Sequence, residues 1–162
     1  MGFRVSLLVA GFLSFGCASP PPQGPTVGAP LPEVPAIGLD RQPASLSGVT
    51  RGRVALVALW ATWCTSCARE LDELNRLQAE VGTTALVVGV AVGEPYEKVA
   101  EYLRPRRLGY AQLVDEDFKL ADALGTKRVP TTLVVNRAGQ LRYAGGALDR
   151  EALSALRQAL AE

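Results

Sequence analysis

Residues 54–67 read VALVALWATWCTSC and place two cysteines shortly after a continuous apolar run. The run from Val54 to Leu59 is typical of a strand buried on both faces of a sheet. After the cysteines, apolar residues recur at helical spacing at positions 71, 74, 77 and 81, and Gly82 follows where a helix would end. This stretch therefore predicts a buried strand followed by a helix, with Cys64 and Cys67 at the start of that helix.

The position of the Cys-Thr-Ser-Cys segment predicts thiol chemistry. A helix N-terminus carries partial positive charge and free N–H groups, which favour the thiolate of Cys64 and lower its pKa. The thiolate is the form that attacks disulfides. Cys67 would lie about one helical turn further on, where it can resolve a mixed disulfide. We therefore expect Cys64 to be the nucleophile and Cys67 the resolving thiol.

The rest of the pattern predicts an α/β fold. A second apolar run at residues 85–92 completes a strand-helix-strand unit, which implies parallel strands joined by a right-handed crossover. Further elements are expected as a helix from Pro95 to about 103, a short strand at 112–114, a helix at 117–124, strands at 131–136 and from 141, and a last helix capped by Asp149 with Leu153, Leu156 and Leu160 facing inward. We predict a mixed sheet with helices on both faces.

Composition excludes several classes of function. The chain has 162 residues, 48% of them hydrophobic, a net charge of +1 and no histidine. The balanced charge argues against nucleic-acid binding. Without histidine, Ser/His/Asp and Cys/His catalysis are excluded, and a four-ligand zinc site is disfavoured. A structural disulfide is also disfavoured because so small a loop constrains little. We expect no cofactor and no metal.

The N-terminal region predicts export. Residues 1–16 carry one early arginine and then an uncharged apolar stretch too short to span a membrane, as in a signal peptide. Gly16-Cys17 resembles the cleavage box of bacterial lipoproteins, although Ser14 stands where those usually have leucine; cleavage after Ala18 is the alternative. Residues 17–32 are predicted to form a proline-rich tether, and residues 33–162 the folded domain.

WATWCTSC, RVPTTLVVNRAGQL and the AVGEP segment together resemble the thioredoxin superfamily, and more closely its exported TlpA/ResA-like thiol-disulfide oxidoreductases. The resemblance covers roughly residues 27–160 and implies a thioredoxin fold with an extra N-terminal hairpin. It further implies a cis proline at Pro130 that faces the cysteines, with Val129 offering backbone groups to a client. Trp63 would cover the disulfide, whereas Trp60 is expected in the core.

The same resemblance implies a proton-relay role for Glu70. Many thioredoxins bury an aspartate six positions before the first cysteine, and Ala58 stands there in this chain. Glu70 lies three residues after Cys67, where this branch carries a glutamate; the alternative is an exposed helix residue. Glu94 is a second candidate carboxylate, and capping of the following helix explains it equally well. The basic cluster Arg104, Arg106 and Arg107 is expected to be a solvated helix end, with an anionic partner or lipid surface as the alternative.

These features predict an envelope reductase of client disulfides, with apocytochrome c among the clients that the resemblance suggests. It would lie on the periplasmic side, anchored by lipid through Cys17, and a membrane thiol donor would regenerate its dithiol. The family usually has proline where Ser66 stands, so the direction of electron flow stays open, and a dithiol oxidase or isomerase is the alternative. A copper-handling protein is a second alternative. A thiol peroxidase is disfavoured because position 61, three residues before Cys64, is alanine rather than threonine.

Overall fold

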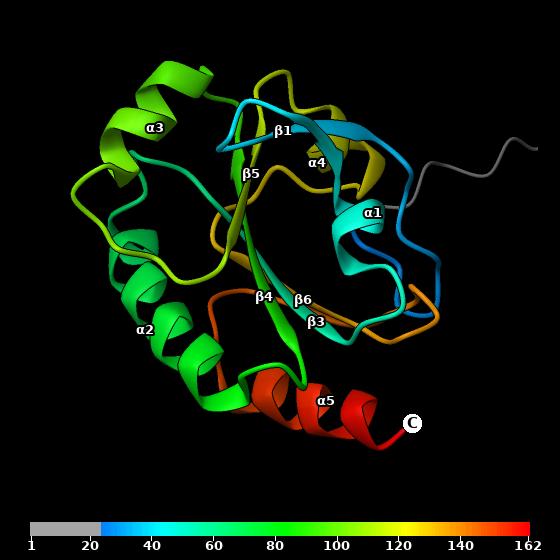
Figure 1. The fold of residues 1–162 in the computed structure, drawn as a ribbon. Coiled ribbons are helices and arrows are strands. Elements are labelled where there is room, and N and C mark those ends of the chain that lie inside the picture. Colours follow the sequence, from blue (N-terminus) through cyan, green and yellow to red (C-terminus); the bar gives the residue numbers. More distant parts are fainter. Residues whose placement is uncertain (1–23) are drawn as a thin grey trace, which may run out of the picture.

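The structure is a computed structural model that describes residues 24–162. One mixed sheet of seven strands forms the centre, in the order β2-β1-β5-β4-β3-β6-β7 (Figure 1). Its strands are β1 (Pro35–Gly38), β2 (Pro43–Ser45), β3 (Ala55–Trp60), β4 (Leu86–Val92), β5 (Ala111–Asp115), β6 (Thr131–Val135) and β7 (Leu141–Gly145). The helices are α1 (Leu46–Thr50), α2 (Thr65–Val81), α3 (Tyr96–Leu103), α4 (Lys119–Ala123) and α5 (Arg150–Ala161).

The middle of the sheet confirms the predicted crossover unit. Strands β3, β4 and β5 are parallel, whereas β6 runs antiparallel to β3 and β7 antiparallel to β6. Every residue of β3 and β6 is buried, as expected for apolar runs covered on both faces. The segment that carries Cys64 and Cys67 therefore follows the carboxyl end of β3, beside the parallel strand β4.

Helices cover both faces of the sheet, as predicted. On one face α2, α3 and α5 pack against Leu56, Ala58 and Trp60 of β3. On the other face α1 and α4 pack against the alternate residues Ala55, Val57 and Leu59. Figure 1 shows the two groups of helices on opposite sides of the sheet. This α/β arrangement with an N-terminal hairpin is the thioredoxin fold expected from the sequence.

The helix ends show where sequence patterns were accurate. Gly82 ends α2 with a φ of 55°, which favours glycine, and the Asp149 carboxylate caps α5 by accepting from Ala152 N at 2.8 Å. In α5, Leu156 is buried, but Leu153 and Leu160 are only half-buried. All three leucines pack against the same core cluster, as predicted, and Ala152 and Ala159 are buried beside them.

Two short helices differ from the prediction. Helix α1 was not expected, although its signal is present, because the Ser45 side chain caps it by accepting from Gly48 N at 3.0 Å. Helix α4 begins at Lys119 rather than 117, because Phe118 before it adopts a left-handed conformation with a φ of 60°. The Phe118 ring occupies the space beside Gly93, where a Cβ atom would clash with it.

The N-terminal hairpin predicted from the family resemblance is present. Strands β1 and β2 pair antiparallel, and β1 joins the sheet by pairing antiparallel with β5. Before the hairpin, residues 28–31 lie along the β7 edge of the sheet. Gly28 N donates to Leu141 O at 2.7 Å, Leu141 N donates to Ala29 O at 2.9 Å, and Leu31 N donates to Gly139 O at 2.9 Å. Packing thus extends to residues ahead of the predicted domain start at 33.

The predicted signal peptide (residues 1–16), Cys17 and the first part of the predicted tether lie outside the described residues. Within residues 24–162, no helix is both long enough and apolar enough to cross a bilayer.

Candidate active site

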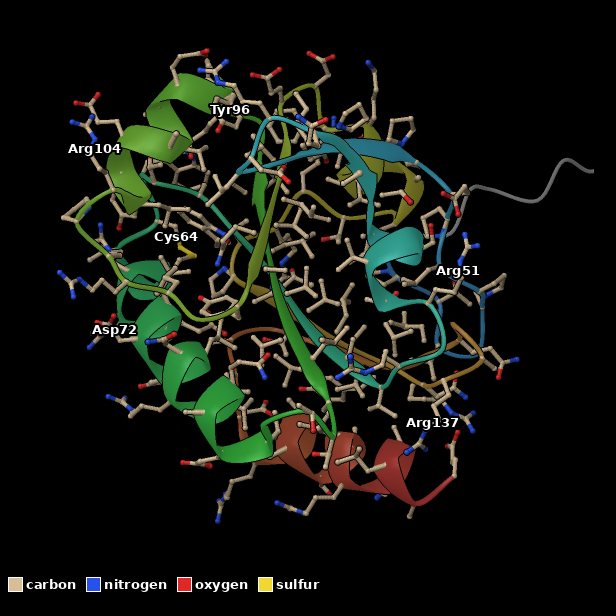
Figure 2. All side chains as sticks on the ribbon, viewed as in Figure 1. Arg51, Cys64, Asp72, Tyr96, Arg104 and Arg137 are labelled. Atoms are coloured by element: carbon tan, nitrogen blue, oxygen red, sulfur yellow. A yellow bond between two sulfur atoms is a disulfide. The ribbon has the colours of Figure 1, made fainter. Side chains whose placement is uncertain are left out.

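Cys64 and Cys67 form a disulfide at the N-terminal end of α2. Cys64 is the N-cap residue of the helix, and its Cα lies 5.2 Å from that of Cys67. The sulfur-bearing side chain of Cys64 lies at this helix end, beyond the carboxyl end of β3 (Figure 2). Cys64 is 7% exposed and Cys67 only 1%, so the first cysteine is the more exposed of the two. An incoming nucleophile or disulfide would meet Cys64 first.

Local hydrogen bonds favour negative charge on Cys64. Its Sγ accepts from the backbone N of Cys67 at 3.2 Å and lies 3.4 Å from the hydroxyl of Ser66. Both contacts would stabilise a thiolate in the reduced protein, in addition to the helix N-terminus. The spacer serine, which replaces the usual family proline, thus supplies a hydroxyl beside the sulfur.

Glu70 lies one helical turn after Cys67 and is buried, with 5% of its surface exposed. Its Oε1 accepts from the backbone N of Leu148 at 2.6 Å and from Thr132 Oγ1 at 3.3 Å. Burial raises the pKa of the Glu70 carboxyl, and these two hydrogen bonds only partly oppose the rise. The alternative of an exposed helix glutamate is therefore wrong.

The sheet register places Glu70 close to the position of Ala58. Ala58 in β3 pairs directly with Thr132 in β6, and Thr132 is the residue whose hydroxyl binds Glu70. The carboxylate of Glu70 therefore reaches the strand beside the position where many thioredoxins carry a buried aspartate. A titratable carboxyl with a raised pKa can hold and release a proton at this place.

Glu94 forms a second buried carboxylate cluster, which we call the Glu94 clasp and which consists of Glu94, Thr62 and Lys98. One carboxylate oxygen of Glu94 accepts from Thr62 N and the other from Thr62 Oγ1, both at 2.6 Å. Lys98 Nζ lies 2.6 Å from Glu94 Oε1. Burial alone would raise the pKa of Glu94, but the hydrogen bonds from Lys98 and Thr62 outweigh it and lower the pKa.

Glu94 does not cap α3, so that interpretation was wrong. The carboxylate of Glu116, which follows β5, accepts from Tyr96 N at 2.6 Å. Glu94 instead holds the loop two residues before Cys64. It thereby links the end of β4 to the segment that presents the nucleophile.

The structure places Pro130 at the start of β6, beside the end of β3. The Val129-Pro130 peptide bond is cis, as expected from the family resemblance. Thr131 pairs with Leu59, so Pro130 lies level with the end of β3 that leads into the active-site segment. Val129 is half-buried and packs against the core cluster that includes Cys64 and Cys67.

The two tryptophans have opposite environments. Trp60 is 1% exposed in the core, as expected, and its indole N–H donates to Gln112 Oε1 at 3.1 Å. Trp63 is 66% exposed and directly precedes Cys64. Trp63 therefore offers an apolar surface next to the nucleophile.

In the part of the chain that the structure describes, no three His, Cys, Asp or Glu side chains come together as metal ligands would. Sequence reasoning missed the partners of the two glutamates, namely Thr62, Lys98, Thr132 and the backbone of Leu148. Only Lys98 had a signal, because it lies four residues after Glu94 and such pairs attract on a helix.

The disulfide at a helix start, beside a thioredoxin-type sheet, defines a thiol-disulfide oxidoreductase of the thioredoxin superfamily. Residues 27–144 match the AhpC/TSA family, and the chain belongs to that family. The comparison with curated protein sequences gives no match.

Solved structures with the same fold include several oxidoreductases. A thiol:disulfide interchange protein of Chlorobium tepidum is 23% identical, with a TM-score of 0.69, covering 83% of this chain and 98% of its own. The exposed lipoprotein thioredoxin Etrx1 of Streptococcus pneumoniae is 21% identical, with a TM-score of 0.67 and coverage of 78% and 99%. A secreted disulfide oxidoreductase of Mycobacterium tuberculosis is 19% identical, with a TM-score of 0.63 and coverage of 80% and 95%. At these identities the likeness establishes the fold.

Proposed function

We propose that this protein is an exported reductase of disulfides in envelope proteins. The observation that carries the proposal is Cys64 at a helix N-cap, more exposed than Cys67, with the buried Glu70 carboxyl one helical turn after Cys67. A helix start favours the attacking thiolate, and a carboxyl with a raised pKa suits proton transfer to and from the second thiol.

The reaction follows from the two thiols. The Cys64 thiolate attacks one sulfur of a client disulfide, a mixed disulfide forms, and the first client thiolate leaves. Glu70 takes the proton of Cys67, whose thiolate then attacks the Cys64 sulfur and releases the second client thiolate. The Cys64–Cys67 disulfide forms, the client gains two electrons, and Glu70 returns its proton to a leaving thiolate.

Three residues are proposed to hold the client. Trp63 supplies exposed apolar surface beside Cys64, while Val129 and Pro130 lie on the neighbouring loop before β6. Family resemblance suggests that Val129 offers backbone groups to an extended client segment. Their position at the same end of the sheet as Cys64 supports this role.

We further propose that residues 1–16 are a signal peptide and that Cys17 carries a lipid on the periplasmic side. Of the predicted tether, residues 17–32, the part before residue 28 would link the folded domain to the membrane, because residues 28–31 pair with Gly139 and Leu141 at the edge of the sheet. The described lipoprotein nature of the pneumococcal relative and the secretion of the mycobacterial one are consistent with this location. Incorporation of a labelled fatty acid into the wild-type protein, but not into Cys17→Ser, is the expected result.

A reductase outside the cytoplasm needs a supply of electrons because envelope conditions favour oxidation. We propose that a membrane thiol protein reduces the Cys64–Cys67 disulfide. Apocytochrome c, whose haem-binding cysteines must be reduced, is the client class that the family resemblance suggests. A Cys67→Ser variant would trap clients as mixed disulfides on Cys64 and allow them to be identified.

The reduction potential of the Cys64–Cys67 pair tests the direction of electron flow. We expect a value near or below that of thioredoxin, about −270 mV, when the pair is titrated against defined thiol buffers with Cys64→Ser as control. A value near about −120 mV would identify an oxidant and overturn the reductase proposal. The same sample, given hydrogen peroxide or Cu(I), should neither consume the peroxide nor have its cysteines protected from alkylation.

A further inference from the structure

An open groove of about 630 Å³ adjoins Pro130. Its lining comes from the loop between α4 and β6 (residues 125–128), from Pro130 and Thr131, and from residues 144–146 at the end of β7. Thr131 begins β6 at the same end of the sheet as Cys64. The groove therefore lies beside the path that a client bound at Cys64 and Pro130 would follow.

The charged side chains at this groove are both positive. Among its lining residues, all of them within residues 24–162, only Lys127 and Arg128 carry a charge. Lys127 Nζ lies 2.8 Å from an oxygen of Asp122, which does not line the groove. Arg128 is exposed and pairs with no carboxylate of the described residues. Arg128 is thus the cation that is available to a bound partner.

Two hydrogen bonds hold the backbone of Arg128 in place. Its N–H donates to Thr126 Oγ1 at 3.2 Å, and its carbonyl accepts from Thr131 Oγ1 at 2.8 Å. The second of these bonds spans the Val129-Pro130 segment that is proposed to hold the client. The Arg128 side chain therefore starts from a fixed point, one residue before Val129.

Two glycines leave space beside these cations. No atom lies within 4 Å of the position that a Cβ would take at Gly146, and a Cβ at Gly145 would meet the hydroxyl of Tyr143. Because glycine has no side chain, an extended segment can approach this backbone closely. The backbone hydrogen bonds from residues 28–31 reach β7 only at Leu141, so they do not cover this end of the strand.

We propose that the groove receives an acidic segment of the client next to its disulfide, and that Arg128 selects it. This inference rests on the proposed function, because the flanking segment reaches the groove only when the client disulfide lies at Cys64. A carboxylate of that segment would accept from the Arg128 guanidinium, whose planar fork suits a carboxylate. Lys127 would add positive potential, and a basic segment would meet like charge.

Three matched peptides test this preference. Each is closed by one internal disulfide, and they differ only in having Glu, Gln or Lys beside the cysteines. The purified protein is reduced, freed of reductant and mixed with each peptide, and the rate constant of a single turnover is measured. At low salt we expect the Glu peptide to react about tenfold faster than the Lys peptide, with the Gln peptide between them. The ratio should fall below about threefold near 1 M salt, where the Debye length is only about 3 Å.

Charge reversal tests the role assigned to Arg128. Arg128→Glu should lower the ratio of the Glu-peptide rate to the Lys-peptide rate from about ten to about one or less. The control is Arg137→Glu, which makes the same change at the turn between β6 and β7, far from Cys64 (Figure 2). In this control the ratio should stay within about twofold of the wild-type value.

The possible failures are distinct. An equal change of the ratio in both variants would assign the preference to net charge and refute the role of Arg128. Equal rates of the wild-type protein with all three peptides would overturn the acidic-client inference while the reductase proposal stands. No reduction of any peptide would overturn both.

Discussion

Glu70 and Glu94 are two glutamates that are almost equally buried, at 5% and 3% exposed, yet their carboxyl pKa values shift in opposite directions. Glu70 accepts only from uncharged groups, on Thr132 and Leu148, and burial dominates. Glu94 accepts from Thr62 and also pairs with the ammonium group of Lys98. The carboxyl of Glu70 also lies deeper below the surface than that of Glu94, so the comparison teaches that the depth of burial and the charge of the partner together decide whether a carboxyl near this disulfide has a raised or a lowered pKa.

The largest expected effect is on catalysis by Glu70→Gln. We expect the rate of client-disulfide reduction near neutral pH to fall about 100-fold, because the amide cannot accept the proton of Cys67. Stopped-flow kinetics over a range of pH would measure it, with Glu94→Gln as the matched substitution at an equally buried glutamate. If both variants lose the same fraction of the rate and show the same pH profile, the assignment of the relay to Glu70 is wrong.

The next largest effect concerns stability at the Glu94 clasp. Glu94→Ala leaves the N–H and hydroxyl of Thr62 without their acceptor, so the free energy of unfolding should fall by about 2 kcal/mol. Urea denaturation would measure this loss. Glu94→Gln should lose less, because the amide oxygen still accepts from Thr62. A loss of equal size in both variants would mean that charge, rather than the hydrogen bonds, holds the clasp.

The pH dependence of stability should differ in sign between the two glutamates. Glu70 has a raised folded-state pKa, so its contribution is greatest below the unfolded-state value and is lost as pH rises through the folded-state pKa. Glu94 has a lowered pKa, so its contribution is present above the unfolded-state value and is lost as pH falls. Each slope is limited to about 1.4 kcal/mol per pH unit.

Urea unfolding at a series of pH values would test both slopes. Glu70→Gln should remove the loss of stability that appears as the pH rises above the usual glutamate pKa. Glu94→Gln should remove the loss of stability that appears as the pH falls below it. Curves that change on the same side in both variants would contradict the comparison.

A smaller effect is expected from the hydroxyl of Thr62. Thr62→Val keeps the shape of the side chain and the backbone bond to Glu94 but removes the Oγ1 contact of 2.6 Å, for an expected cost of about 1 kcal/mol. Thr62→Ser should retain most of that stability in thermal or urea unfolding. If serine is as destabilising as valine, the methyl group and not the hydroxyl is the important part.

The smallest effect should come from Lys98→Met. The Lys98 side chain is 55% exposed, so solvent screens its attraction to Glu94 and the expected loss is only about 0.5 kcal/mol. The pKa of Glu94 should rise in this variant, which nuclear magnetic resonance titration of the carboxyl carbon would detect. An unchanged pKa would show that the Thr62 bonds alone keep Glu94 ionised.

The sequence was sufficient to predict the fold around the disulfide because apolar runs and cap residues are local signals. Strands β3, β4 and β6 lie within one residue of the predicted ranges, and Cys64 begins the helix as expected. The position of Glu70 on that helix followed from spacing and family resemblance. Its burial did not, because Leu148 binds it from a loop 78 residues away, and only tertiary packing brings the two together.

Glu94 illustrates the other limit. A glutamate just before a helix that begins at a proline is a reasonable capping residue by sequence alone. Whether Glu94 or Glu116 accepts from the backbone N of Tyr96 depends on the turn after β5. No local sequence pattern encodes that turn. Similarly, the orientation of Gln112 depends on Trp60, which is 52 residues away.

The pairing of residues 28–31 with Gly139 and Leu141 has a mechanical consequence. A pull on the chain from its N-terminal side would load these three backbone hydrogen bonds before it reached β1. The bonds lie at the β7 edge of the sheet, at the opposite edge from β2, and beside the turn that joins β6 to β7. Tension would therefore enter the protein through the start of β7, at the end of the sheet opposite Cys64 and Pro130, rather than through the N-terminal hairpin.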